Sequence, residues 1–268
     1  MVYIDPDFRR VVESHLAGNL VVAPTGSPLI LGIFGPAGEG KTYQIDHLCA
    51  ELGLRTSIIS PGELESENAG HPAQLIRREY LAIGTRTERG VLVVNDLDTV
   101  LGDWGSLVQY TVNRQVVFGQ LMALCDYPTS VAGAACERVP IIITGNNPSA
   151  LYGPLMRPGR TRIYAWTPTA EGRAPVVETI FPEIQSDQVS TLVSKFPKRP
   201  VSFWADVRAT LWEAVLADWI DSDGGASLRQ LISRGQKMRP SATPYSIEAI
   251  SEVARNLDSS DVRDSTYI

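Results

Sequence analysis

Cysteine and histidine are scarce in this chain of 268 residues, which contains three of each: Cys49, Cys125, Cys136, His15, His47 and His71. The odd number and wide spacing of the cysteines do not predict a disulfide framework, and they are typical of thiols in a reducing compartment. The histidines lack the spacing of metal ligands. We therefore expect neither disulfide bonds nor a transition metal held by the protein.

Long apolar runs and basic charge are lacking as well. No segment approaches the ~18 apolar residues of a membrane helix, and the net charge of −6 argues against a nucleic-acid surface. The first residues, MVYIDPDFRRVVESHL, have neither the apolar core of a secretory signal nor the basic character of a transit peptide. The sequence thus predicts a cytoplasmic protein without nucleic-acid or membrane partners.

A glycine-rich stretch follows directly on an apolar segment. Residues 29–34 read Leu-Ile-Leu-Gly-Ile-Phe, and the next eight form the pattern Gly-x-x-x-x-Gly-Lys-Thr: Gly35, Pro36, Ala37, Gly38, Glu39, Gly40, Lys41 and Thr42. Between a predicted strand and a predicted helix, this pattern indicates a phosphate-binding P-loop. We expect the three glycines to adopt positive φ and to turn backbone N–H groups toward an anion.

The last two residues of this loop suggest the ligand. The Lys41 ammonium can reach the β- and γ-phosphates of a nucleotide, and the Thr42 hydroxyl can ligate Mg²⁺. A helix that begins near Thr42 adds the positive end of its dipole. The predicted cofactors are therefore ATP and Mg²⁺.

Apolar runs alternate with helical patterns up to residue 165. We expect strands at 29–34, 55–59, 91–94, 141–143 and 162–165, and helices at 43–52, from Pro72 onward and at 111–124. Fully apolar strands that alternate with helices favour a parallel sheet covered on both faces. The fold class is thus α/β, a P-loop module with a parallel five-stranded sheet, and the ligand should lie at the carboxyl ends of its strands.

Beyond residue 166 only helical patterns remain, at 187–195, 202–220, 227–234 and 246–257. Ser202 and Ser246 are expected N-caps, and Pro175 is expected to delay the start of a helix. We therefore divide the chain into a short N-terminal segment (1–27), an α/β nucleotide-binding domain (28–166), a small α-helical domain (167–258) and a solvated tail (259–268).

Polar residues at two predicted strand ends are candidates for catalysis. Asp96 and Asp98 follow strand 91–94, where a P-loop ATPase places an acid that holds Mg²⁺ or polarises water. Asn146 follows strand 141–143 and could orient water near the γ-phosphate. Asp and Asn are also common turn residues, and this alternative stays open for all three.

Three arginines have two interpretations each. Arg157 and Arg160 lie in a turn rich in Pro and Gly, where they are either solvated or reach the γ-phosphate of a neighbouring subunit. Arg208 lies on an amphipathic helix with large apolar residues. It either extends along that apolar face or contacts the phosphate as a sensor.

Together these motifs closely resemble Rubisco activase, a family of AAA+ ring ATPases. The segments that carry the resemblance are GELES at 62–66, NAG at 68–70, NDLD at 95–98, QYTVN at 109–113, RVPIIITGN at 138–146 and YAWTPT at 164–169. The resemblance extends from about residue 28 to 220. It implies that the helical domain is the lid of an AAA+ module.

The resemblance also implies residue roles. Lys41 and Thr42 correspond to the Walker A residues, Asn95 occupies the usual metal-associated Asp position and Asp96 the usual catalytic Glu position. The metal ligands would be Thr42 and Asp96, but the division of roles between Asn95, Asp96 and Asp98 stays open.

Further roles implied by the resemblance concern the sensors and the finger. Asn146 corresponds to sensor 1, Arg157 and Arg160 to the arginine-finger pair, and Arg208 to sensor 2. A second arginine that the family commonly has after sensor 2 is replaced by Thr210, which puts the strength of that contact in doubt.

The implied function is ATP-driven remodelling of Rubisco that is blocked by tight-binding sugar phosphates. Activases form hexameric rings, and loops 60–72 and 99–108 would line the pore that pulls on Rubisco. The expected location is the cytoplasm of a bacterium, a cyanobacterium by this reading, with carboxysome association, or the chloroplast stroma for a processed form. Alternatives are an activase-like remodeller of another client and a nucleotide-gated assembly protein.

Some segments depart from the family pattern. We expect neither the N-terminal extension of plant activases nor the C-terminal Rubisco small-subunit-like module of some cyanobacterial ones. The connection 127–138 is short, and residues 222–232 share little with the segment associated with Rubisco specificity. These departures bear on the client rather than on the ATPase site.

Overall fold

The computed structural model describes residues 2–22, 26–65, 68, 70–100, 108–221, 225–233 and 245–264. Contacts within the chain divide it into two compact units, Val2–Thr167 and Pro168–Ile268. Within the described ranges, none of the helices combines the length and the apolar character that crossing a bilayer demands.

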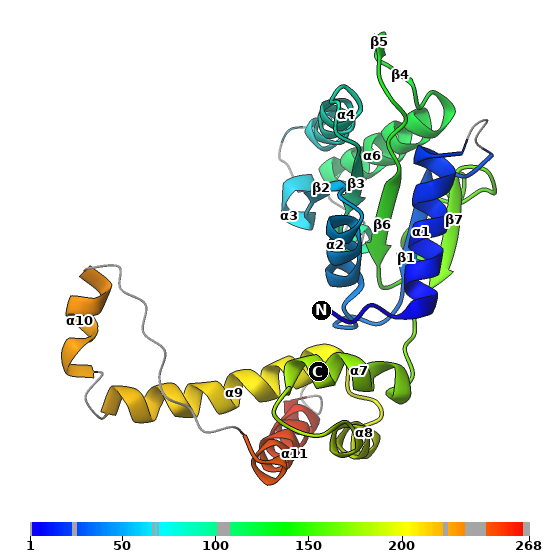
Figure 1. The fold of residues 1–268 in the computed structure, drawn as a ribbon. Helices are drawn as coiled ribbons and strands as arrows, with labels where there is room; N and C mark the ends of the chain where they lie inside the picture. The colour runs from blue at the N-terminus through cyan, green and yellow to red at the C-terminus, as the bar shows by residue number, and fades with distance from the viewer. Residues whose placement is uncertain are drawn as a thin grey trace. The chain divides into compact units, whose positions relative to one another are not determined.

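The first unit is built on five parallel strands: β1 (Ile30–Phe34), β2 (Arg55–Ile59), β3 (Gly90–Val94), β6 (Ile141–Gly145) and β7 (Thr161–Ala165). Their order in the sheet is β2-β3-β6-β1-β7 (Figure 1). The first residue of β1, Ile30, lies opposite Ile141 of β6 and Thr161 of β7. The predicted five-stranded parallel sheet is therefore confirmed, and β1 lies between β6 and β7.

Helices cover both faces of this sheet (Figure 1). Helices α1 (Pro6–Leu20) and α2 (Lys41–Glu51) pack with Leu31 and Ile33 of β1 on one face. Helices α4 (His71–Gly84) and α6 (Val108–Asp126) pack with Ile30 and Phe34 on the other. Successive side chains of a strand point to opposite faces, so a continuous apolar strand serves both layers.

Short elements complete the first unit: α3 (Pro61–Leu64), α5 (Leu97–Val100), a two-stranded hairpin of β4 (Ser130–Val131) and β5 (Ala134–Ala135), and the 3₁₀ helix η1 (Pro148–Ala150). The hairpin lies in the connection 127–138 and is not predicted from the sequence. Its turn contains Ala132 and Gly133, both with positive φ.

The position of helix α1 differs from the predicted division of the chain into domains. Residues 1–27 are predicted from the sequence to be a separate segment, but the described residues from Val2 onward belong to the α/β unit. The Asp5 carboxylate accepts hydrogen bonds from the backbone N of Asp7 and Phe8 and so caps the helix. Phe8 is fully buried and packs edge-on against Trp166, with ring centroids 5.1 Å apart.

The second unit is helical and consists of α7 (Ala170–Ile180), α8 (Ser186–Lys195), α9 (Val201–Trp219), α10 (Gly225–Ser233) and α11 (Ile247–Asp264). Its apolar core contains Phe181 of the α7–α8 connection, Leu192 of α8, Trp204 of α9 and Ile250 of α11. The predicted change from α/β to all-helical structure near residue 166 is thus observed.

Several predicted helix ends in this unit are wrong. Pro175 lies inside α7, whose start is set upstream, where the Thr169 hydroxyl accepts a hydrogen bond from Gly172 N. Helix α9 begins at Val201 after Pro200, so Ser202 is not its cap. Ser246 does cap α11, since its hydroxyl accepts from Ala249 N at 3.2 Å. Helix α11 also continues to Asp264, into the segment predicted as a tail.

The packing of α1 predicts the effect of truncating its buried aromatic ring. Phe8→Ala should lower the free energy of unfolding by about 3–5 kcal/mol, because the side chain is buried and leaves a cavity against the sheet. Urea unfolding followed by circular dichroism measures this change. Arg10→Ala is the matched control, because that side chain is 77% exposed on the same helix and should change stability little. An unchanged midpoint for Phe8→Ala would show that α1 is not part of the unit.

Candidate active site

The glycine-rich loop connects β1 to α2, at the carboxyl end of the sheet. Gly38 and Gly40 have φ values of 74° and 71°, as predicted for this loop. Gly35 does not have positive φ, which corrects the prediction made for it. It is required instead by a close approach, because a Cβ at this position would lie 1.7 Å from the carbonyl oxygen of Trp166.

Trp166, directly after β7, fixes the shape of this loop. Its backbone N donates to the Phe34 carbonyl at 2.6 Å, and its indole Nε1 donates to the Glu39 carbonyl at 3.1 Å. Glu39 is buried, whereas Pro36, Ala37 and Gly38 are exposed. Trp166 therefore holds the loop at Phe34 and Glu39, and the residues between these two points include the exposed Pro36, Ala37 and Gly38.

Lys41 is the first residue of α2, and its side chain is buried. The ammonium donates to the carbonyl oxygens of Gly35 at 2.8 Å and Pro36 at 2.9 Å, and to Asn146 Oδ1 at 3.3 Å. Burial lowers the pKa of Lys41, although nearby carboxylates, among them Asp96, act in the opposite direction. The structure thus brings the P-loop lysine and the predicted sensor 1 residue together.

A network of hydrogen bonds joins α2 to the ends of β3 and β6. The Asn95 side-chain oxygen accepts from the Thr42 hydroxyl and, at 2.7 Å, from the Thr144 hydroxyl. The Thr144 hydroxyl in turn accepts from Asp96 N at 3.0 Å. Sequence reasoning did not single out Thr144, although a polar residue at the end of an apolar strand is a usable signal for such a role.

Asp96 is half-buried beside this network. Its backbone φ is 43°, in the left-handed region that residues other than glycine rarely adopt. Within the described part of the chain, its carboxylate has one hydrogen-bond partner, Asn95 Nδ2 at 3.3 Å. The carboxylate is therefore available to a ligand. Backbone strain of this kind is often found at functional positions.

Asp98 makes contacts that differ from those of Asp96. It is buried, and its Oδ2 accepts hydrogen bonds from the backbone N of Asn146 at 2.7 Å and of Asn147 at 2.8 Å. Among the described residues its Oδ1 has no hydrogen-bond partner, and this oxygen lies next to Gly145. Asp98 thus holds the turn that carries Asn146 through one of its two carboxylate oxygens.

The donor set at this edge fits Mg²⁺ together with a nucleotide. Where residues are described, no group of three or more His, Cys, Asp or Glu side chains is placed to hold a metal ion. A hydroxyl from Thr42 and a carboxylate from Asp96 supply hard oxygen donors. Mg²⁺ typically binds to one or two protein oxygens plus phosphates and water, rather than to a full protein cage.

The two candidate finger arginines are not part of this cluster. Arg160 directly precedes β7, whose first residue Thr161 lies opposite Ile30, the first residue of β1. The P-loop begins only after the last residue of β1. Five residues of parallel strand span roughly 16 Å. Arg157 and Arg160 therefore lie at the opposite end of the sheet from the P-loop of their own chain.

Arg208 belongs to the helical unit and is engaged there. Its Nη1 donates to Glu183 Oε1 at 2.8 Å, and its guanidinium lies 5.6 Å from the ring centre of Phe181 and 5.4 Å from that of Tyr245. These contacts match the interpretation of Arg208 as a residue of an apolar face.

The predicted pore loops are described only in part. Residues 66, 67 and 69 of the first loop and 101–107 of the second lie outside the described residues, as do 222–224 of the segment compared with the Rubisco-specificity region. Their proposed roles stay predictions.

Comparisons with known proteins agree with the P-loop geometry described above. A model of the family described as "ATPase family associated with various cellular activities (AAA)" matches residues 31–169, just over half of the chain. Among solved structures, the AAA domain of FIGL-1 in complex with ADP superposes with a TM-score of 0.63 at 16% identity, covering 97% of this chain and 86% of that one. At this identity the likeness concerns the fold.

Curated relatives carry the name ribulose bisphosphate carboxylase/oxygenase activase, chloroplastic. The protein of Chlamydomonas reinhardtii is 40% identical over 249 residues, which cover 88% of this chain and 61% of that protein. The protein of Arabidopsis thaliana is 39% identical over 234 residues, which cover 83% of this chain and 49% of that protein. This chain thus spans about half to three-fifths of these relatives, and the resemblance to Rubisco activases is confirmed.

The different environments of the two aspartates predict different effects of the same substitution. Asp98→Asn should lower the free energy of unfolding by about 1–3 kcal/mol, because two charge-assisted hydrogen bonds weaken and a buried amide N–H₂ gains no acceptor. Asp96→Asn, the matched control, should change stability little because its carboxylate is half-buried and makes one weak contact. Urea unfolding of both variants measures this, and equal effects would contradict the assignment of Asp98 to the turn.

Proposed function

Because the chain belongs to the AAA family of ATPases, we propose that it binds ATP with Mg²⁺ and hydrolyses it to ADP and phosphate. The observation that carries the proposal is the convergence of side chains from three elements on one edge of the sheet. Lys41 of α2 contacts Asn146 after β6, and Thr42 shares the Asn95 amide oxygen with Thr144.

Each of these residues has a chemical task in the proposed reaction. The Lys41 ammonium exchanges its loop carbonyl partners for phosphate oxygens, and its partly desolvated charge interacts strongly with them. Thr42 and Asp96 supply oxygens toward Mg²⁺ or its bound water. The Asp96 carboxylate, whose one hydrogen bond among the described residues comes from Asn95, can also polarise the attacking water, and Asn146 orients that water beside the γ-phosphate.

We infer that hydrolysis requires a ring of several copies, hexameric in our proposal. The support is the position of the candidate finger residues at the end of the sheet remote from their own P-loop. An arginine there stabilises transition-state charge only in the nucleotide site of a neighbouring copy. Such fingers supplied in trans are worth ~10³–10⁵ in rate.

Rubisco is the proposed client, and the support is the name that the curated relatives carry. In this proposal ATP hydrolysis drives conformational cycles of the ring, and pore loops pull on Rubisco until tightly bound sugar phosphates escape. The proposed location is a compartment that holds Rubisco, either a bacterial cytoplasm or the chloroplast stroma.

The ATPase proposal predicts a dependence on protein concentration. Activity per subunit should rise with concentration as copies assemble, and Arg157→Ala should lower it by ~10³-fold without abolishing ATP binding. Phosphate release and the binding of a fluorescent ATP analogue measure the two properties. Arg10→Ala, an exposed arginine on α1, is the control and should behave like the unmodified chain.

A mixing experiment sharpens this test. Lys41→Ala chains lack the phosphate lysine but keep Arg157, so adding them to Arg157→Ala chains should restore activity at the intact nucleotide sites. Full turnover by dilute, unmixed Arg157→Ala protein would contradict a finger supplied by a neighbour.

The client is tested with Rubisco locked by ribulose bisphosphate. Adding the protein with ATP should restore carboxylation, whereas a non-hydrolysable ATP analogue should not. ATP hydrolysis without recovery, across Rubiscos of several forms, would favour an activase-like remodeller of another client. Ring assembly and partner binding without any hydrolysis would favour a nucleotide-gated assembly protein.

A further inference from the structure

We propose that Arg157 alone reaches the nucleotide of a neighbouring copy, and that Arg160 is a positioning residue tethered to Asp126 of its own chain. The inference rests on the proposed ATPase function. It assigns different tasks to two arginines that the resemblance treats as a pair, and it gives Asp126, which no motif singles out, a part in catalysis.

All three nitrogens of the Arg160 guanidinium are engaged within its own chain. Nε donates to Asp126 Oδ1 at 3.1 Å, and Nη2 donates to Asp126 Oδ1 at 3.0 Å and Oδ2 at 2.9 Å. Nη1 donates to the Pro154 carbonyl at 3.2 Å. This fork-shaped pairing has the geometry that makes an arginine–carboxylate pair specific. To reach a neighbour's phosphate, Arg160 would have to give up every one of these bonds.

The backbone of Arg160 is anchored as well. Its carbonyl accepts from Ile30 N at 3.1 Å, which joins it to β1, and from the Cys125 thiol with a sulfur–oxygen distance of 3.9 Å. Burial raises the pKa of Cys125 to about 12, so the thiol stays protonated and remains a donor. Side chain and backbone together fix residue 160 between the C-terminus of α6 and the start of the sheet.

The charge at the C-terminus of α6 also favours the ion pair between Asp126 and Arg160. Asp126 is the last residue of α6, where the partial negative charge of the helix C-terminus disfavours a carboxylate. The positive charge of the Arg160 guanidinium offsets the negative charge of the Asp126 carboxylate and the partial negative charge of the helix C-terminus. The pair is partly exposed, with 28% of the arginine side chain and 45% of the aspartate accessible, so its main effect is on geometry rather than on global stability.

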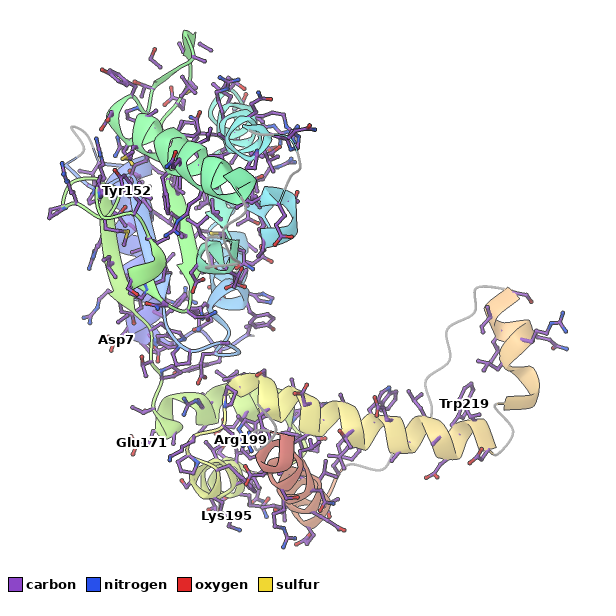
Figure 2. The ribbon with its side chains drawn as sticks, turned by 180° about the vertical axis from the view of Figure 1, so that it is seen from behind. Asp7, Tyr152, Glu171, Lys195, Arg199 and Trp219 are labelled. Atoms are coloured by element: carbon purple, nitrogen blue, oxygen red, sulfur yellow. The ribbon has the colours of Figure 1, made fainter. Side chains whose placement is uncertain are left out.

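Arg157 differs from Arg160 in both its exposure and its contacts. It is exposed, and its side chain forms no hydrogen bond or ion pair with any residue that the structure describes. The turn that carries it is held on both sides. Before it, Leu155 is fully buried, and Tyr152 (labelled in Figure 2) packs on Phe118 of α6 with ring centroids 5.7 Å apart. After it comes the tethered Arg160, whose N donates to the Arg157 carbonyl at 3.1 Å.

This arrangement explains why one arginine needs the other. A finger is effective only if its guanidinium reaches the phosphate in the right orientation, and an error of ~1 Å costs on the order of 10²-fold in rate. The Arg160–Asp126 pair removes freedom from the turn, so the exposed Arg157 side chain projects from a fixed base.

Kinetics of four variants test the assignment at saturating protein concentration. Asp126→Ala and Arg160→Ala should each lower kcat by ~10–10²-fold and leave the KM for ATP unchanged, because the P-loop is remote. Arg157→Ala should lower kcat by ~10³-fold. Asp7→Ala removes an exposed carboxylate that also pairs with an arginine, Arg10, and serves as the matched control without effect.

The charge-reversed double variant Asp126→Arg/Arg160→Asp is the decisive measurement. If residue 160 acts only through residue 126, the exchanged pair can re-form, and kcat should return to within about fivefold of the unmodified chain. If Arg160 itself contacts phosphate, the exchange places a carboxylate there, and activity should stay lost. Recovery supports the tether, and a double variant as inactive as Arg160→Ala overturns it, as does full activity of Asp126→Ala.

Hydrogen exchange of residues 151–160, followed by mass spectrometry, gives a readout independent of ATP hydrolysis. Asp126→Ala and Arg160→Ala should speed exchange of this turn about tenfold, the double variant should restore slow exchange, and Arg157→Ala should leave it unchanged. Unchanged exchange in Asp126→Ala would overturn the tether even if the ATPase proposal holds. An unmodified chain without ATPase activity at any concentration would instead overturn the proposed function, and exchange would still decide the tether.

Discussion

The candidate site depends on one amide oxygen, that of Asn95, which accepts hydrogen bonds from Thr42 of α2 and Thr144 of β6. Through these bonds the end of β3 is tied to the P-loop helix on one side and to the neighbouring strand on the other. The same strand ends carry Asp96 and Asn146, so the relative positions of the carboxylate, the amide and the Lys41 ammonium follow from this junction. A network in which each member is satisfied keeps such side chains in single orientations.

The parallel direction of the strands separates two kinds of chemistry. Because all five strands point the same way, phosphate-binding residues gather at their carboxyl ends, whereas the turn that enters β7 lies at the other end. One chain therefore presents a nucleotide site at one edge and an exposed Arg157 at the other. The head-to-tail contact that we propose between copies would bring these two edges together, and contacts of this kind generate rings when the rotation closes.

Three carboxylates near these sites illustrate how environment sets the role of a residue. Asp98 is buried and committed to backbone N–H groups, Asp96 is half-buried with an available carboxylate, and Asp126 is partly exposed and paired with Arg160. Only the second resembles a catalytic group. The first and third position other residues, one holding the turn of Asn146 and the other the turn of Arg157.

Local patterns in the sequence determined the five strands of the main sheet, the P-loop, the parallel direction of the strands and the all-helical second unit, because strand periodicity, glycine spacing and the βα order are properties of short segments. Helix α1 was not predicted, although its N-cap Asp5, Pro6 at the first helical position and the spacing of Phe8, Val12 and Leu16 are local signals of a helix. Tertiary structure alone decided that Gly35 serves a close approach to Trp166, that Asp98 caps the turn of Asn146, and that Arg160 pairs with Asp126. Each joins residues separated by 34 or more positions in the chain, and no local pattern encodes such a contact.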